Sequence, residues 1–404
     1  MKTIAVAGTY DSKKVELMFV KDVLESLGIN TITINCGVFQ PMVSTDIKSI
    51  DIAAEIGEDL REIAAKKDRA LGTEVMAKAM ERAIPRLYAE GRFDGIISLG
   101  GTGGTSLVTP GMRALPIGVP KVMVSTVASG NVSQYVGTSD IIMVPSIVDV
   151  SGLNSISTRI FKNAALAIAG MVSLENEEKV LDKKPLIAAT MFGVTTPGVN
   201  KAREYLEEHG YEVLVFHATG TGGKTMERLI EEGYFVGVLD LTTTEWCDEL
   251  VGGVLAAGPT RLEAAGKAKT PQVVSVGALD MVNFGPIDTV PEEFKGRNLY
   301  KHNPTVTLMR TTVEENMQLG EIIAEKLNMS QGPTALMLPL KGVSMIDAEG
   351  QPFFGPVEDQ VLFDALKKNI DRIKVELIEM DNNINDEEFA LAAAMKLIDL
   401  IEGR

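Results

Sequence analysis

Short runs of β-branched and other apolar residues alternate with longer segments of helical periodicity along almost the whole chain. This alternation predicts an α/β protein with mostly parallel sheets. In the first half, strands are predicted over residues 4–7, 31–35, 95–99 and 122–126, and helices over 13–27, 73–90 and 154–173. In the second half, strands are predicted over 186–191, 212–216, 235–239, 273–276, 306–309, 335–338 and 375–380, and helices over 197–209, 224–233, 313–327, 359–370 and 386–401.

A charged stretch separates the two halves. Residues 174–184 carry seven charges and are followed by Pro185 and a new apolar run. Such a shift in composition is typical of a domain boundary. We therefore expect two Rossmann-like domains, residues 1–180 and 185–404, with a cleft between them. A solvated loop within one larger domain is the alternative.

Composition narrows the class of partner. The formal net charge is −16, so the average surface repels nucleic acid and anionic lipid, which leaves a small molecule as the expected ligand. No apolar run approaches the roughly 18 residues that span a bilayer. The two cysteines, Cys36 and Cys247, are too few for a disulfide framework and lie far apart. We expect a reduced, cytoplasmic protein.

The first candidate for chemistry is a glycine-rich loop that follows the predicted strand 95–99. Glycines let the backbone approach an anion closely, and the exposed N–H groups of such a loop suit phosphate. A tight strand-to-helix turn is the alternative, although it needs fewer glycines. The residues assigned to a phosphate-bearing cofactor are Gly100, Gly101, Thr102, Gly103, Gly104 and Thr105.

Three polar residues follow the first predicted strand. Thr9, Asp11 and Lys13 stand where ligands of open α/β sheets bind, and we assign them to the same cofactor site. Asp11 can instead cap the following helix, a role that is compatible with ligand binding.

A second glycine loop, with the same Gly-Thr-Gly-Gly letters, follows the predicted strand 212–216. With Lys224 it forms a relaxed Walker A pattern, and Asp240 then resembles a magnesium-holding aspartate. Ala218 replaces the first glycine, and the loop follows the second strand of its domain, so we favour a substrate loop over a P-loop. Its residues are Thr219, Gly220, Thr221, Gly222 and Gly223.

Two residues are candidates for catalysis. His217 and Asp240 each follow an apolar run that we interpret as one of two adjacent parallel strands. Side chains just beyond such strands point into the crevice where α/β proteins bind ligands. The alternative is that His217 bonds a carbonyl and Asp240 caps a helix. The other polar groups near strand ends, which lack a diagnostic spacing, are Glu245, Asp248, Glu249, Arg261 and Asp280.

Several of these segments together resemble the family named for the N-terminal ATP-binding domain of the tomato mosaic virus resistance protein. The resemblance covers essentially the whole chain. It rests on residues 8–13, 99–105, 216–223, 239–245, 278–285, 302–304 and 340–344.

This resemblance implies two Rossmann-like domains, ATP with Mg²⁺ as ligand, and a homodimer. Within the 278–285 motif, it leads us to assign Asp280 and Asn283 to substrate binding. The plant protein has a further C-terminal half that resembles TIM-barrel phosphoenolpyruvate hydrolases. A separate protein of that kind is therefore an expected functional partner.

The leading hypothesis is a cytoplasmic protein that binds ATP and Mg²⁺ and acts on a small phosphorylated or carboxylated metabolite in the cleft between its domains. No metal site made by protein ligands alone is assigned. A non-catalytic, dimeric ATP-binding scaffold is the alternative hypothesis, and a P-loop NTPase using residues 218–225 is a third and less favoured one. The sequence leaves open whether the protein is an enzyme.

Overall fold

The computed structural model describes residues 2–173 and 184–404, so most of the predicted boundary segment 174–184 lies outside the described residues. The chain divides into unit 1, residues 1–179, and unit 2, residues 180–404. Each unit is an α/β layer structure with a parallel sheet, which confirms the predicted fold class. No helix in the described part of the chain is long and apolar enough to cross a membrane.

Unit 1 is built on a five-stranded, fully parallel sheet in the order β2-β1-β3-β4-β5. Its strands are β1 (Thr3–Gly8), β2 (Asn30–Asn35), β3 (Gly95–Gly100), β4 (Lys121–Ser125) and β5 (Ile142–Pro145). Its helices are α1 (Lys14–Ser26), α2 (Ser49–Ala54), α3 (Leu60–Ala65), α4 (Arg69–Ala89), α5 (Thr102–Arg113), α6 (Ser133–Val136) and α7 (Ser157–Ser173).

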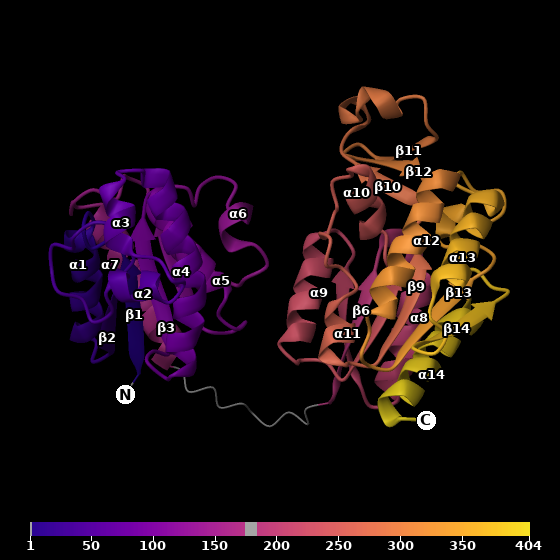
Figure 1. The fold of residues 1–404 in the computed structure, drawn as a ribbon, viewed down its shortest axis with the longest axis horizontal. Coiled ribbons are helices and arrows are strands. Elements are labelled where there is room, and N and C mark those ends of the chain that lie inside the picture. The colour runs from indigo at the N-terminus through magenta and orange to yellow at the C-terminus, as the bar shows by residue number, and fades with distance from the viewer. Residues whose placement is uncertain (1, 174–183) are drawn as a thin grey trace. The chain divides into compact units, whose positions relative to one another are not determined.

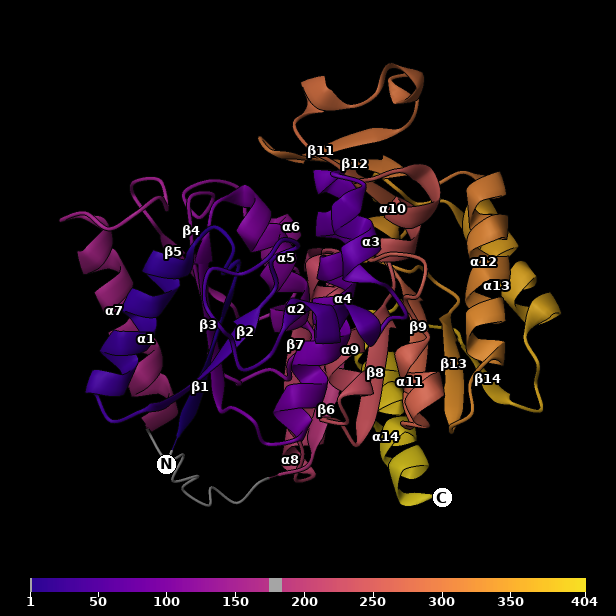
Figure 2. The ribbon, with the colours of Figure 1, turned by 60° about the vertical axis from the view of Figure 1, so that its left-hand side comes forward.

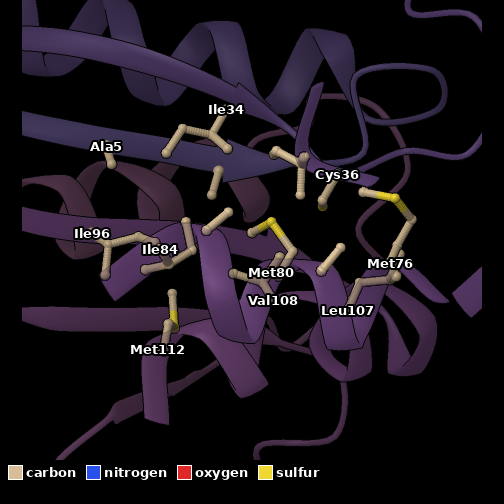
Figure 3. Close-up of a cluster of buried hydrophobic side chains, with 14 of the residues drawn as sticks. Ala5, Ile34, Cys36, Met76, Met80, Ile84, Ile96, Leu107, Val108 and Met112 are labelled. Carbon is tan, nitrogen blue, oxygen red and sulfur yellow. The ribbon is translucent and has the colours of Figure 1, made fainter. Parts of the chain in front are cut away.

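Helices cover both faces of this sheet (Figure 1). On one face, α1 and α7 bury a cluster that includes Leu17, Phe161 and Ile97. On the other, α4 and α5 pack over Ile34 and Ile96 (Figure 3). Burial on both faces explains why the strands are almost uniformly apolar.

Unit 2 contains a six-stranded parallel sheet in the order β14-β13-β9-β8-β6-β7. Its strands are β6 (Leu186–Met191), β7 (Glu212–His217), β8 (Gly237–Thr242), β9 (Gln272–Gly277), β13 (Thr334–Pro339) and β14 (Val375–Met380). Its helices are α8 (Thr196–Glu208), α9 (Thr221–Glu231), α10 (Glu245–Val251), α11 (Ala264–Ala268), α12 (Val313–Asn328), α13 (Pro356–Asn369) and α14 (Glu387–Glu402). Four 3₁₀ turns lie at Gly193–Thr195 (η1), Ile287–Thr289 (η2), Glu292–Phe294 (η3) and Met345–Asp347 (η4).

A small antiparallel sheet is inserted between β9 and α12. It consists of β10 (Met281–Phe284), β11 (Leu299–Asn303) and β12 (Val306–Arg310) in the order β10-β12-β11. Figures 1 and 2 show β11 and β12 at one end of unit 2, with η2 and η3 in the connection that precedes them.

The two parallel sheets share one topology. Numbered by occurrence, unit 1 has the strand order 2-1-3-4-5, and unit 2 has 2-1-3-4-5-6. In such sheets the crevice beside the first strand, where successive connections pass to opposite faces, is the usual ligand site. In unit 1 this crevice lies between β1 and β3, and in unit 2 it lies between β6 and β8.

Most of the long elements match the predicted pattern, but helix α5 and three short strands were missed. β5 is an edge strand of four residues that is only partly buried, and β10 and β11 belong to the small antiparallel sheet. β8 also runs further than predicted, to Thr242, because Leu241 and Thr242 continue its buried run. This extension changes the position of Asp240, as described below.

Candidate functional site

Unit 1 has a cavity of about 680 Å³ at the carboxyl ends of β1 and β3, the crevice that its topology marks. This volume is within the range of small-molecule sites. The loop after β1 and the start of α5 both line it, and so do parts of the α3–α4 connection. The predicted cofactor residues in its wall are Thr9, Asp11, Lys13, Gly100, Gly101, Thr102, Gly103 and Gly104.

The amino end of α5 opens into this cavity. Gly101 is its N-cap and has no side chain to cap the helix. Among the described residues, no side chain accepts a bond from the N–H groups of Thr102, Gly103 or Gly104. A helix end with unsatisfied N–H groups and a positive dipole favours an anion.

Thr105, the last predicted cofactor residue, is placed differently. It is fully buried, and its hydroxyl donates to the Gly101 carbonyl at 2.8 Å and bonds the Ser125 hydroxyl at 2.6 Å. Thr105 therefore holds the loop from beneath and does not line the cavity. The sequence-based assignment of Thr105 to direct ligand contact is corrected accordingly.

Two cations at the cavity wall were missed by the sequence analysis. Lys67 and Arg69 line the cavity beside the α5 loop. A Cβ added at Gly103 would lie 3.7 Å from an Arg69 guanidinium nitrogen, so this cation stands close to the helix end. The helix was predicted to begin at Thr73, but Asp68 caps α4 by accepting from the Ala70 and Leu71 N–H groups. Aspartate is a favoured N-cap residue, so Asp68 was the signal in the sequence that could have placed the start of this helix.

The loop after β1 is held in place by the rest of unit 1. Asp11 accepts a bond from the Phe39 N–H at 3.1 Å, and Lys13 donates through its ammonium to the Val150 carbonyl. Gly37 allows the Asp11 carboxyl to approach, because a Cβ there would lie 2.6 Å from a carboxylate oxygen. Asp11 is therefore fixed at the cavity wall.

The second glycine loop meets a carboxylate of its own protein. The N–H groups of Gly220 and Gly223 donate to Glu245 Oε1, at 2.7 and 3.1 Å. Glu245 is fully buried, and a Cβ at Gly223 would lie 2.2 Å from its other oxygen. The anion position at the start of α9 is thus filled by Glu245, an arrangement that the Walker A reading does not accommodate.

An arginine neutralises this buried carboxylate. Arg261, 1% exposed, donates through Nε to Glu245 at 2.7 Å and through Nη2 to Asp240 at 2.7 Å, and it pairs with Glu227 at 3.2 Å. Burial lowers the pKa of Arg261, but Asp240 and the two glutamates together raise it well above its usual value. Burial also raises the pKa of Glu227.

His217 and Asp240 do not form the predicted pair. β6 lies between β7 and β8, so the two strands are not adjacent and are about 9–10 Å apart. His217 ends β7 and is exposed, with its ring 5.4 Å from that of Phe192. Asp240 lies inside β8, is 2% exposed, and accepts from Thr190 and Arg261. The placement of Asp240 beyond its strand was wrong, since β8 continues past it.

Asp280 and Asn283 lie in separate buried networks. Asp280 accepts from the Ser344 hydroxyl at 2.8 Å, and burial raises its pKa to about 6. Asn283 donates through its amide to Asp248 at 2.7 Å, and burial raises the pKa of Asp248 to about 7. Both predicted residues are fully buried. One carboxylate oxygen of Asp280 and the amide oxygen of Asn283 have no hydrogen-bond partner among the described residues. Their assigned substrate role stays a prediction.

Comparisons with known proteins agree with the two-part fold. Residues 2–177 match the N-terminal domain, and residues 184–401 the C-terminal domain, of the uncharacterised protein family UPF0261. A UPF0261 protein of Clostridium tetani is 57% identical over 99% of both chains, and one of Rhizobium meliloti is 46% identical, also over 99% of both. The tomato ToMV resistance protein Tm-1(GCR237) is 42% identical over 97% of this chain and 55% of its own length. The chain belongs to the UPF0261 family.

Proposed function

We propose that unit 1 binds the phosphates of ATP, together with Mg²⁺, in the cavity between the ends of β1 and β3. The observation that carries this proposal is the open amino end of α5, whose free N–H groups stand beside Arg69 in the cavity wall. Backbone donors, a helix dipole and a guanidinium at one point are the usual elements of a phosphate site.

The carboxylates of the cavity fit a metal that arrives with the nucleotide. Asp11 and Asp149 both line the wall, and Mg²⁺ bound with nucleotides usually takes one or two carboxylates plus phosphate oxygens and water. Within the described ranges, no group of three or more histidine, cysteine or acidic side chains could hold a metal ion. Asp11 and Asp149 would therefore hold Mg²⁺ only with phosphate present.

The experiment is calorimetric titration of the full chain with MgATP. A Cβ at Gly103 meets only Arg69, at ordinary contact distance, so Gly103→Val should fold while its methyl groups fill the phosphate position. We expect affinity to fall at least tenfold. Lys224→Ala is the matched control in the other loop and should leave affinity unchanged. Loss of binding in Lys224→Ala with retention in Gly103→Val would refute the proposal.

We further propose that the protein is an enzyme acting on a small phosphorylated or carboxylated metabolite. Incubation with MgATP and a metabolite panel separates this from a non-catalytic scaffold. Product formation that disappears in Gly103→Val is the expected result. Tight MgATP binding without turnover would favour the scaffold. The homodimer and a separate TIM-barrel partner stay predictions.

A further inference from the structure

Unit 1 has a second cavity beside the first. It has a volume of about 720 Å³ and lies at the carboxyl end of β2, between the 38–45 segment and helices α2 and α3. We call it the β2-end cavity. Val38, Phe39, Gln40 and Ala64 line both cavities, so the two share a wall.

The loop that forms this cavity is anchored at several points. The Asn35 side chain, 1% exposed, accepts from the Tyr10 and Gly37 N–H groups and donates to the Ser49 hydroxyl. Further along, Ile47 forms a parallel bridge with Ile34, which returns the loop to the edge of the sheet. The cavity is therefore part of the fold.

Its lining combines apolar side chains with positive charge. Phe39 and Met42, 54% and 63% exposed, both line this cavity and offer a ligand an apolar surface there. Lys48 and Arg61 line the same cavity, and in the described part of the chain neither has an ion-pair partner.

Acidic residues are absent from the described lining of the β2-end cavity, although the whole chain carries a net charge of −16. The one acidic side chain of the 38–50 segment, Asp46, is engaged elsewhere. Its carboxylate accepts from the Thr33 N–H at 2.8 Å and from the Thr33 hydroxyl at 2.6 Å. The charged side chains that line this cavity are therefore both cations, an arrangement that favours an anion.

We infer that the β2-end cavity binds a small organic acid, with its carboxylate at Lys48 and Arg61 and its apolar body against Phe39 and Met42. A guanidinium suits the planar carboxylate group. The open helix end that suits phosphate lies in the neighbouring cavity. The role of this acid as a second substrate beside ATP rests on the proposed function, whereas its binding to the β2-end cavity does not.

The test is titration of the full chain, labelled with ¹³C at its methionine methyl groups, with 3-phenylpropionate. Met42→Leu identifies the Met42 signal and preserves an apolar side chain. We expect 3-phenylpropionate to move this signal and the neutral 3-phenylpropanol to bind at least tenfold more weakly. Equal binding of acid and alcohol, or an unmoved Met42 signal at tens of millimolar, would overturn the inference.

Charge variants locate the carboxylate. The double variant Lys48→Gln/Arg61→Gln should bind 3-phenylpropionate at least tenfold more weakly. The control double variant Lys66→Gln/Arg92→Gln, at two exposed residues outside the cavity, should bind it as the unaltered protein does. Equal weakening in both pairs would refute a specific site. Gly103→Val should retain binding, so that failure of the ATP proposal is distinguished from failure of this one.

Discussion

The two glycine loops share the four-residue sequence Gly-Thr-Gly-Gly but lie in different surroundings. The loop of unit 1 follows the third strand, opens into a cavity and stands beside Arg69. The loop of unit 2 follows the second strand, at the edge of its sheet, and its N–H groups bind the buried Glu245. An anion position formed by backbone N–H groups can thus be offered to a ligand or satisfied internally.

The glycines themselves are required for different reasons. In unit 2, a Cβ at Gly222 would lie 1.9 Å from the His217 carbonyl oxygen, so absence of a side chain is a packing requirement. In unit 1, a Cβ at Gly103 would make only an ordinary contact. Glycine at that position leaves room in the cavity, as expected for a ligand site.

The largest effect should come from Arg261→Met, which leaves the buried Asp240 and Glu245 and the partly buried Glu227 without their cation. We expect unit 2 to lose about 3–5 kcal/mol of stability. The single tryptophan, Trp246, begins the α10 region beside Glu245, so its fluorescence in a urea titration reports unit 2. Arg203→Met, which breaks an exposed pair with Glu207, should cost under about 1 kcal/mol. Equal losses would contradict the internal role of Arg261.

Removing the Glu245 carboxylate should leave the second glycine loop with an open anion position like that of the first loop. Glu245→Ala leaves the Gly220 and Gly223 N–H groups unpaired, which should cost about 2–3 kcal/mol. Inorganic phosphate can then enter, so it should raise the urea midpoint of the variant, measured by Trp246 fluorescence, relative to chloride at equal ionic strength. In the unaltered protein phosphate should give only the smaller rise that comes from its exclusion from the protein surface. An identical response in both proteins would count against a filled position.

Alanine substitution in each loop compares the two glycine requirements directly. Gly222→Ala should destabilise unit 2 by about 2 kcal/mol, because the new methyl group meets a backbone oxygen. Gly103→Ala should change stability by no more than about 0.5–1 kcal/mol, toward greater stability in a helix. Urea unfolding followed by circular dichroism measures both. Similar losses at the two positions would remove the distinction.

The units should also differ in their response to pH. In unit 2, burial raises the pKa of Asp359 to about 8, with Asp347 adding to the rise. The folded unit therefore holds protons that the unfolded chain releases above about pH 4. The free energy of unfolding should therefore fall as pH rises from 5 to 8, by about 1.4 kcal/mol per pH unit for each such proton.

Asp359→Asn should flatten this fall, measured as the urea midpoint by Trp246 fluorescence. In unit 1, burial alone would raise the pKa of Asp46, but hydrogen bonds from Thr33 outweigh this effect and lower it below its usual value. That carboxylate loses its contribution only at acid pH, below its usual range. A slope in Asp359→Asn equal to that of the unaltered protein would contradict the assignment.

Local patterns predicted most of the fold, and eight of the residues assigned to the cofactor from sequence line the unit 1 cavity, because long periodic segments and a glycine loop after a strand are signals in the chain itself. Other features depended on contacts distant in sequence. Asp240 is in the strand interior because Arg261, twenty-one positions later, neutralises it. Likewise Glu245 reaches Gly220 from twenty-five positions away. No local pattern distinguishes a glycine loop that faces a ligand from one that faces a carboxylate of its own protein.

The most direct test observes the two loops in one sample. Full-length protein labelled with ¹⁵N-glycine is titrated with MgATP, and the loop amide signals are identified with glycine-to-alanine variants. The account predicts that the Gly101, Gly103 and Gly104 signals shift, while those of Gly220 and Gly223 remain in place. A shift of the Gly220 and Gly223 signals with the first three unmoved would contradict it.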